Sequence, residues 1–170
     1  MSLLTSEAWP VGLLNIFEHN RDNHSTFENR YRGPYDKLLN YCFGDGFTFY
    51  VGLHNPPVES RDSVDSDTLV LFVVFHKKSD SPVFFLEVKD DTWAQKAAFR
   101  LRADHQMRSR YGFMLSECPL PRLWGISVLG NSMWTYCGDK EAFSVDPKAT
   151  PHPRASSRVL PPAYLDGEWE

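Results

Sequence analysis

The strongest indication of the fold in this sequence is the run Pro82-Val83-Phe84-Phe85-Leu86-Glu87-Val88-Lys89. It is a nearly continuous apolar run, as expected of a strand buried on both faces of a sheet. Successive side chains of a strand point to opposite faces, so Glu87 and Lys89 share one face. Leu86 and Val88 then point to the other. Since burying charge is costly unless the charge is paired or bound to metal, an acid and a base that emerge together from a core strand indicate a site.

Carboxylates precede a second apolar run, residues 68–75, which we also expect to be a buried strand. Asp62, Asp65 and Asp67 lie just before it. A polar turn separates the two runs, so they can pair as a hairpin, and the start of the first strand then lies near the end of the second. Asp65 or Asp67 would therefore lie beside Glu87. Two carboxylates with open water positions suit Mg²⁺ or Mn²⁺.

The rest of the chain predicts an α/β fold with a central mixed β-sheet flanked by helices. Further strands are expected at residues 47–51, 123–129 and 133–137, and helices at residues 27–42, with an interruption at Gly33-Pro34, and at residues 92–114. We expect a core domain at residues 26–143. An N-terminal arm would precede it at residues 1–25, and an irregular C-terminal tail would follow at residues 144–170.

The composition suits a folded globule, with 42% apolar and 24% charged residues among 170. Its three cysteines lack the spacing of a disulfide framework or a zinc motif. We see no signal peptide at the start and no apolar stretch long enough to span a membrane, and we expect an intracellular protein of the cytoplasm or nucleus. The C-terminal end lacks a cap, which hints at a longer parent chain. No small-molecule cofactor is expected.

The predicted helix at residues 92–114 carries a basic stripe. Between Trp93 and Tyr111 it has five basic side chains against one acid. Arg102, Gln106 and Arg110 recur every four residues and therefore share one face. A basic helix beside the sheet could bind the phosphates of a nucleic acid. The alternative is an ordinary solvated helix face, and the net charge of −4 with a pI near 5.8 counts mildly against a nucleic-acid partner.

Five ordered blocks carry a family resemblance, at residues 28–35, 61–65, 82–89, 102–108 and 123–130. An aspartate, a short gap and then Glu-x-Lys on a hydrophobic hairpin resemble the signature of the PD-(D/E)XK nuclease superfamily. More closely, the chain resembles a large group of uncharacterised fungal proteins that carry this fold. The resemblance spans roughly residues 26–140 and implies a restriction-endonuclease-like core.

The resemblance also implies roles for individual residues. Asp65 would be the motif aspartate, and Glu87 and Lys89 the Glu-x-Lys pair. Glu28 would be the acid of the first helix, so that Asp65, Glu87 and Glu28 hold Mg or Mn. Gln106 matches a helix glutamine that follows this core in several branches of the superfamily.

Two departures from the family pattern bear on these roles. Ser66 follows Asp65 where an apolar residue is usual, so Asp67 stays a rival for the motif aspartate. Asp90 and Asp91 follow Lys89 directly and would repel an approaching phosphate.

Two functions follow from the resemblance and the candidate residues. The first is a metal-dependent nuclease that hydrolyses phosphodiester bonds of nucleic acid, with Asp65, Glu87 and Lys89 as catalytic residues. Arg102, Gln106 and Arg110 would contact the nucleic acid. The alternative is a binding or regulatory module that kept the fold and lost catalysis. A simple surface pair of glutamate and lysine on a hairpin rim is the plainest reading of Glu87 and Lys89 taken alone.

Overall fold

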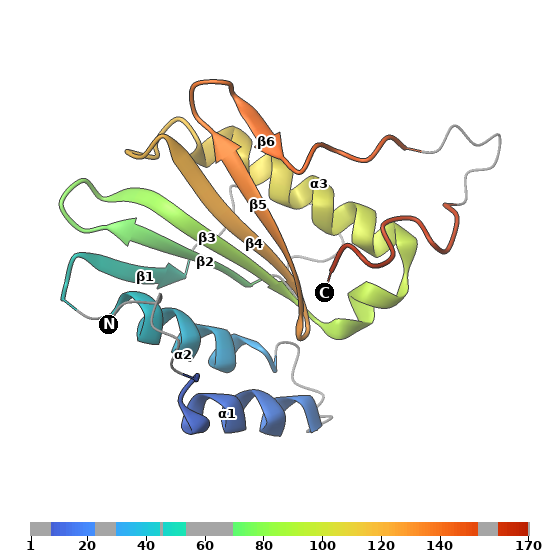
Figure 1. The fold of residues 1–170 in the computed structure, drawn as a ribbon, viewed down its shortest axis with the longest axis horizontal. Helices are drawn as coiled ribbons and strands as arrows, with labels where there is room; N and C mark the ends of the chain where they lie inside the picture. The colour runs from blue at the N-terminus through green and yellow to red at the C-terminus, as the bar shows by residue number, and fades with distance from the viewer. Residues whose placement is uncertain (1–7, 23–29, 45, 54–69, 153–159, 170) are drawn as a thin grey trace.

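A computed structural model describes residues 8–22, 30–44, 46–53, 70–152 and 160–169 of the chain. Its centre is a six-stranded sheet whose strands follow one another in chain order (Figure 1). The strands are β1 Phe49–Leu53, β2 Val70–His76, β3 Ser81–Lys89, β4 Arg122–Leu129, β5 Ser132–Asp139 and β6 Ser144–Asp146. The helices are α1 Val11–Asp22, α2 Arg32–Phe43 and α3 Ala97–Met114, together with the 3₁₀ helix η2 Asp91–Gln95. None of the described helices has the length and apolar character needed to cross a membrane.

The sheet is mixed because one of its five strand pairs is parallel. β3 and β4 pair in parallel, and every other neighbouring pair is antiparallel. A parallel pair needs a long crossover connection, and here η2 and α3 supply it. The prediction of an α/β fold with a mixed sheet and flanking helices is therefore confirmed at that level.

Helices cover both faces of the sheet. α3 packs on the face that carries Phe85 and Tyr136, and α2 packs on the face that carries Leu86 and Val88. α1 lies outside α2 and reaches it through Phe17, among other contacts (Figure 1). The alternation predicted for β3 is therefore confirmed, because its odd- and even-numbered side chains belong to different hydrophobic clusters.

The predicted hairpin is also confirmed. β2 and β3 pair antiparallel, with Val70 opposite Val88 and Leu71 opposite Glu87. The start of the described part of β2 therefore lies at the same end of the sheet as Glu87 and Lys89. β1 begins two residues later than predicted, since Phe47 has a positive φ of 55°, which belongs to a turn.

Three predicted boundaries were wrong. The helix predicted at residues 92–114 is two elements, because Lys96 has an extended backbone between η2 and α3. Gly33-Pro34 does not interrupt a helix but lies in the first turn of α2, where proline costs no hydrogen bond. The segment from residue 144, predicted to be irregular, begins with β6, and its later residues include the buried Trp169. The division of the chain into arm, core and tail stays a prediction.

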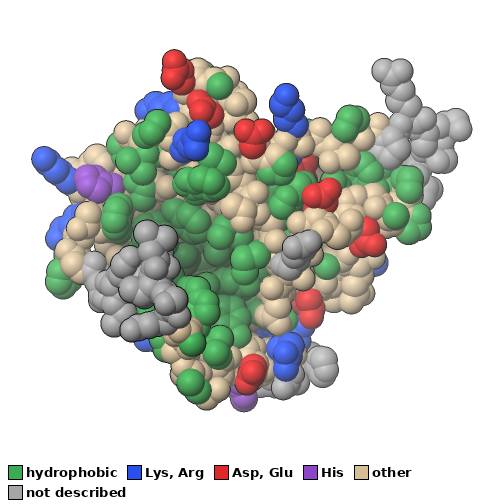
Figure 2. All heavy atoms as spheres, viewed as in Figure 1, with side chains coloured by type: hydrophobic (Ala, Val, Ile, Leu, Met, Phe, Trp, Pro, Cys, Tyr) green, Lys and Arg blue, Asp and Glu red, His purple; other side chains and the backbone are tan. Residues whose placement is uncertain are grey.

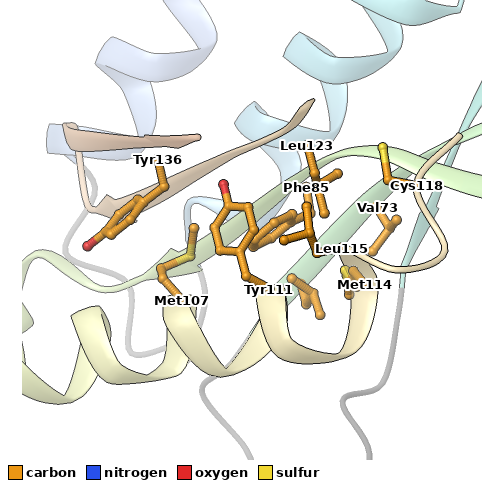
Figure 3. Packing of buried hydrophobic residues seen from close by; sticks show 10 residues of the cluster. Val73, Phe85, Met107, Tyr111, Met114, Leu115, Cys118, Leu123 and Tyr136 are labelled. Carbon is orange, nitrogen blue, oxygen red and sulfur yellow. The ribbon is translucent and has the colours of Figure 1, made fainter. Parts of the chain in front are cut away.

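Tyr111 fills the narrowest part of the core between α3 and the sheet. Its ring is fully buried, points from the helix toward the strands, and meets Phe85 edge to face at 4.9 Å between centroids (Figure 3). Two glycines make room for it. A Cβ added at Gly125 would lie 2.8 Å from the Tyr111 hydroxyl, and one added at Gly138 would lie 2.5 Å from the ring. This close approach fixes the distance between α3 and strands β4 and β5.

We predict that Gly138→Ala lowers the free energy of unfolding by about 1–3 kcal/mol, because the added methyl overpacks the Tyr111 site. The matched control is Gly112→Ala on the exposed side of α3, where an added Cβ meets nothing within 4 Å. Alanine favours helix over glycine by roughly 0.5–1 kcal/mol, so this control should raise stability. Thermal and urea melts of both variants measure the difference. Equal effects of the two substitutions would contradict the packing argument.

Candidate active site

Glu87 lies in the middle of the sheet, on a strand that is hydrogen-bonded on both sides. Its neighbours across β2 and β4 are Leu71 and Ser127. Its side chain is on the face covered by α3 and has no exposed surface. A carboxylate at this position needs partners, because an isolated buried charge costs several kcal/mol.

Two cationic side chains supply those partners. The Nζ atom of Lys89 lies 3.1 Å from Oε1 of Glu87, and Nε of Arg110 donates a hydrogen bond of 3.3 Å to Oε2. The Lys89 contact is an ion pair, and Oε1 accepts no further hydrogen bond from the residues that the structure describes. Lys89 and Arg110 are 2% and 1% exposed. The plain reading of Glu87 and Lys89 as a surface pair is therefore wrong.

Lys89 is held from a second side by an aromatic ring. Its Nζ lies 4.2 Å from the centroid of the Trp93 ring, which belongs to η2. Burial lowers the pKa of the Lys89 amino group below its usual range. The charge of Glu87 opposes this shift, and the nearby charges of Arg110 and Arg102 add to it. The ammonium is thus held in place by protein groups and has lost most of its contact with water, which is why its pKa is lowered.

The predicted stripe on α3 runs along this site. Arg110 faces Glu87, while Arg102 and Gln106 are half-buried. The Cζ atom of Arg102 lies 5.8 Å from the centroid of Trp93. Oε1 of Gln106 is buried without a hydrogen-bond donor among the described residues. The alternative interpretation, an ordinary solvated helix face, is therefore wrong at Arg110. The contact of these three residues with nucleic acid stays a prediction.

The two aspartates after Lys89 are paired. Arg30 contacts Asp91 through NH2 and Oδ2 at 2.6 Å, and lies 3.7 Å from Asp90 through Nε. Asp90 also accepts a hydrogen bond of 3.0 Å from the backbone of Thr92 and so begins η2. Because Arg30 offsets their charge, the repulsion expected from the doubled aspartates is weaker than the sequence suggested.

The remaining predicted ligands lie outside the described residues. This holds for Glu28, Asp65 and the rival Asp67. Among the described residues no three or more His, Cys, Asp and Glu side chains gather in a group that could hold a metal. Glu87 is therefore the one predicted metal ligand whose surroundings are known. Its proximity to Asp65 and Glu28 stays a prediction.

Sequence reasoning assigned no role in the site to Trp93 or Arg30. Trp93 is a core residue with 7% exposure. The one feature of the sequence that could have suggested its contact with Lys89 is its position, four residues after that lysine. The chain turns directly after β3 into η2, which Asp90 caps, and this turn brings Trp93 back to Lys89 at the end of the strand. Arg30 is 60 and 61 residues from Asp90 and Asp91, so no local pattern could have paired them.

A separate apolar groove lies on the opposite face of the sheet. Its cavity of about 360 Å³ is lined by Phe43, Phe49, Val83, Phe84, Leu120, Trp124, Ile126 and Thr135. Figure 2 shows hydrophobic side chains concentrated in a hollow near the centre of the view, with many charged side chains toward the periphery. Ile126 and Phe84 pack with the cluster on the α2 side, whereas Glu87 faces α3, so the groove and the charged site do not meet.

Comparison of the chain with protein-family models, curated proteins and solved structures finds no match.

We predict that Glu87→Ala lowers the free energy of unfolding by about 3–5 kcal/mol, because it leaves two buried cations without their shared acid. If Glu87 mainly repelled neighbouring carboxylates, the substitution would instead raise the free energy of unfolding. The matched control is Glu141→Ala, which removes an exposed glutamate and should change stability by less than about 0.5 kcal/mol. Urea unfolding at neutral pH measures both. A neutral effect of Glu87→Ala would show that the ion cluster does not stabilise the fold.

Proposed function

We propose that this chain is a metal-dependent nuclease-like domain that hydrolyses phosphodiester bonds of nucleic acid. One observation carries the proposal: Glu87 and Lys89 form a fully buried acid–lysine pair at the end of a core strand. A fold gains no obvious stability from such a pair, because apolar residues of similar size would serve as well or better. Perturbed, desolvated charges of this kind gather at functional sites more often than elsewhere.

The proposed ion is Mg²⁺ or Mn²⁺, held by Glu87 with Asp65 and Glu28. Oε1 of Glu87 fits this role, because it is a hard oxygen atom whose one charged contact among the described residues is the Lys89 ammonium. Bound there, the ion would polarise a phosphoryl oxygen and lower the pKa of an attacking water. Asp67 stays the rival for the place of Asp65.

Lys89 would stabilise the charge that develops on the phosphoryl group in the transition state. Its ammonium cannot bind a cation, but it is held within 3.1 Å of the carboxylate that does. Arg110 orients the same carboxylate through Oε2, so an ion would approach Oε1 and share it with the Lys89 ammonium. Arg102 and Gln106 lie further along the same helix face, and we propose that they contact the phosphate backbone.

We further propose that the core is restriction-endonuclease-like. The support is the mixed sheet with helices on both faces, as the resemblance to PD-(D/E)XK nucleases implies. The parallel step from β3 to β4 places α3 directly over Glu87. The fold alone does not establish an activity, so the proposal depends on the side chains of the site.

A binding or regulatory module without catalysis is the second candidate. One observation favours it: both oxygens of Glu87 already contact cations of the protein itself. An ion would have to compete with Lys89 for Oε1. In this case the charged cluster has a structural role only, and divalent ions leave the protein unchanged.

We predict that Lys89→Met abolishes cleavage but keeps metal binding, whereas Glu87→Gln loses both. Methionine keeps the buried stem of the lysine, and glutamine keeps the shape of the glutamate while removing its charge. Cleavage of plasmid and of DNA and RNA oligonucleotides is measured with Mg²⁺ and with Mn²⁺, and Mn²⁺ affinity by titration calorimetry. Lys148→Ala, an exposed lysine outside the site, serves as the control and should behave as wild type.

The outcomes separate the two candidate functions. Wild-type protein that neither binds Mn²⁺ nor cleaves any substrate would reject the nuclease and favour the binding module. Metal binding that depends on Glu87, without cleavage, would support the ion site and reject hydrolysis of the tested nucleic acids. Cleavage that survives Lys89→Met would reject the role given to Lys89.

A further inference from the structure

Residues 160–169, here called the C-terminal strap, pack against the start of α3 and the end of β4. Arg100 of α3 holds the strap through its backbone: Nε and NH2 donate to the carbonyl oxygen of Tyr164 at 3.1 and 2.9 Å. NH2 also donates to the carbonyl of Pro162. At the far end, Nε1 of Trp169 donates to Oγ of Ser127 at 3.3 Å. The strap is therefore fixed at two points to the elements beside the candidate site.

The same guanidinium reaches η2. NH1 of Arg100 donates to the carbonyl oxygen of Ala94, the residue after Trp93. Arg100 is 4% exposed, so it bridges η2 and the strap from inside the protein. A planar guanidinium with its donors directed at several carbonyls sets their relative positions more strictly than a lysine would.

Apolar packing joins Trp93 to the strap as well. One buried cluster contains Trp93, Ala97, Ala103, Leu129, Tyr164, Leu165 and Trp169. Three of these side chains come from the strap. Trp93 therefore meets Lys89, whose Nζ lies 4.2 Å from the ring centroid, and also belongs to a cluster that the strap completes.

We propose that the C-terminal strap positions the Lys89 ammonium by holding Trp93 against it. Trp93 is a positioning residue in this scheme, and Arg100 and Leu165 hold it in place. Confining the ammonium of a lysine costs the rotamer entropy of its long side chain. The ring of Trp93 offsets part of that cost through its attraction for a cation. A displaced strap frees the ring and with it the ammonium.

The inference rests on the proposed function only where Lys89 is said to act on a phosphodiester. The positioning itself is a property of the protein alone and can be measured without metal or substrate. An aromatic ring shifts the resonances of nuclei above its face, so NMR of ¹³C-lysine-labelled protein reports the contact between Lys89 and Trp93. Lys89→Met identifies the Lys89 signal by its loss.

Two leucines of the chain give a matched comparison. Leu165 and Leu115 are both 5% exposed, but Leu165 packs in the cluster of Trp93 and Leu115 in the cluster of Tyr111. We predict that Leu165→Ala moves the Lys89 ε-methylene signal toward the position of exposed lysines, as Trp93→Ala does. Leu115→Ala should lower the melting temperature to a similar degree and leave that signal in place. Trp93→Phe should retain part of the ring shift.

Milder variants keep the test decisive if a leucine variant fails to fold. Arg100→Lys keeps the charge but loses the fork that joins η2 to the strap, and Arg108→Lys is its control on the same helix. A Lys89 signal that moves in Trp93→Ala but not in Leu165→Ala or Arg100→Lys would overturn the role of the strap. A signal unchanged in Trp93→Ala would overturn the whole inference.

Activity provides a second readout. If wild-type protein cleaves nucleic acid, Leu165→Ala should lower kcat roughly 10–100-fold with KM unchanged, as expected of a misplaced catalytic group. An unchanged kcat beside a displaced Lys89 signal would confirm the positioning and reject the catalytic role of Lys89. If wild-type protein is inactive, the nuclease proposal fails and the NMR comparison alone decides the positioning.

Discussion

A single buried carboxylate organises one face of this protein. Glu87 has no exposed surface, and its oxygens meet Lys89 from its own strand and Arg110 from α3. The apolar packing around Tyr111 holds α3 on the sheet. It does not by itself fix the arrangement of the polar side chains between α3 and β3. The ion cluster fixes this arrangement. A shift of α3 along β3 would separate Glu87 from Arg110, and the buried charges would find little water in place of their lost partners. It thereby ties the longest helix to the central strand at a defined position.

The sequence predicted the strands better than the helix boundaries, and the shared face of Glu87 and Lys89 better than the side chains around them. Alternation of buried side chains placed Glu87 and Lys89 on one face, and the hairpin followed from two apolar runs and a polar turn. Both depend on local pattern alone. Arg110 was found as part of a stripe, but its burial depends on the height of α3 over the sheet. That height is set by Gly125 and Gly138, which lie on other strands.

Long-range pairing explains most of what sequence reasoning missed. Arg30 meets Asp91 across 61 positions, and Arg100 meets the strap across more than 60. The hydrogen-bond acceptors of Arg100 are backbone carbonyls, which no residue type marks in a sequence, and its acidic contact in the strap is the exposed Asp166 at 3.7 Å. Strand β6 is three residues long and carries no distinctive alternation. Predicted ligands before β2 lie outside the described residues, so the metal part of the site stands as it did at the sequence level.

The strap has a consequence for the order in which the protein is completed during synthesis. The buried residues of both clusters that hold the sheet between its helices lie no later in the chain than Tyr136, so most of the core can form once residue 139 has left the ribosome. Arg100 and Trp93 must then wait for residues 162–169 before their last partners exist. At a translation rate of about 5–20 residues per second, that interval lasts roughly one to a few seconds. A nascent chain can therefore be folded for a time while the surroundings of Lys89 are still unfinished.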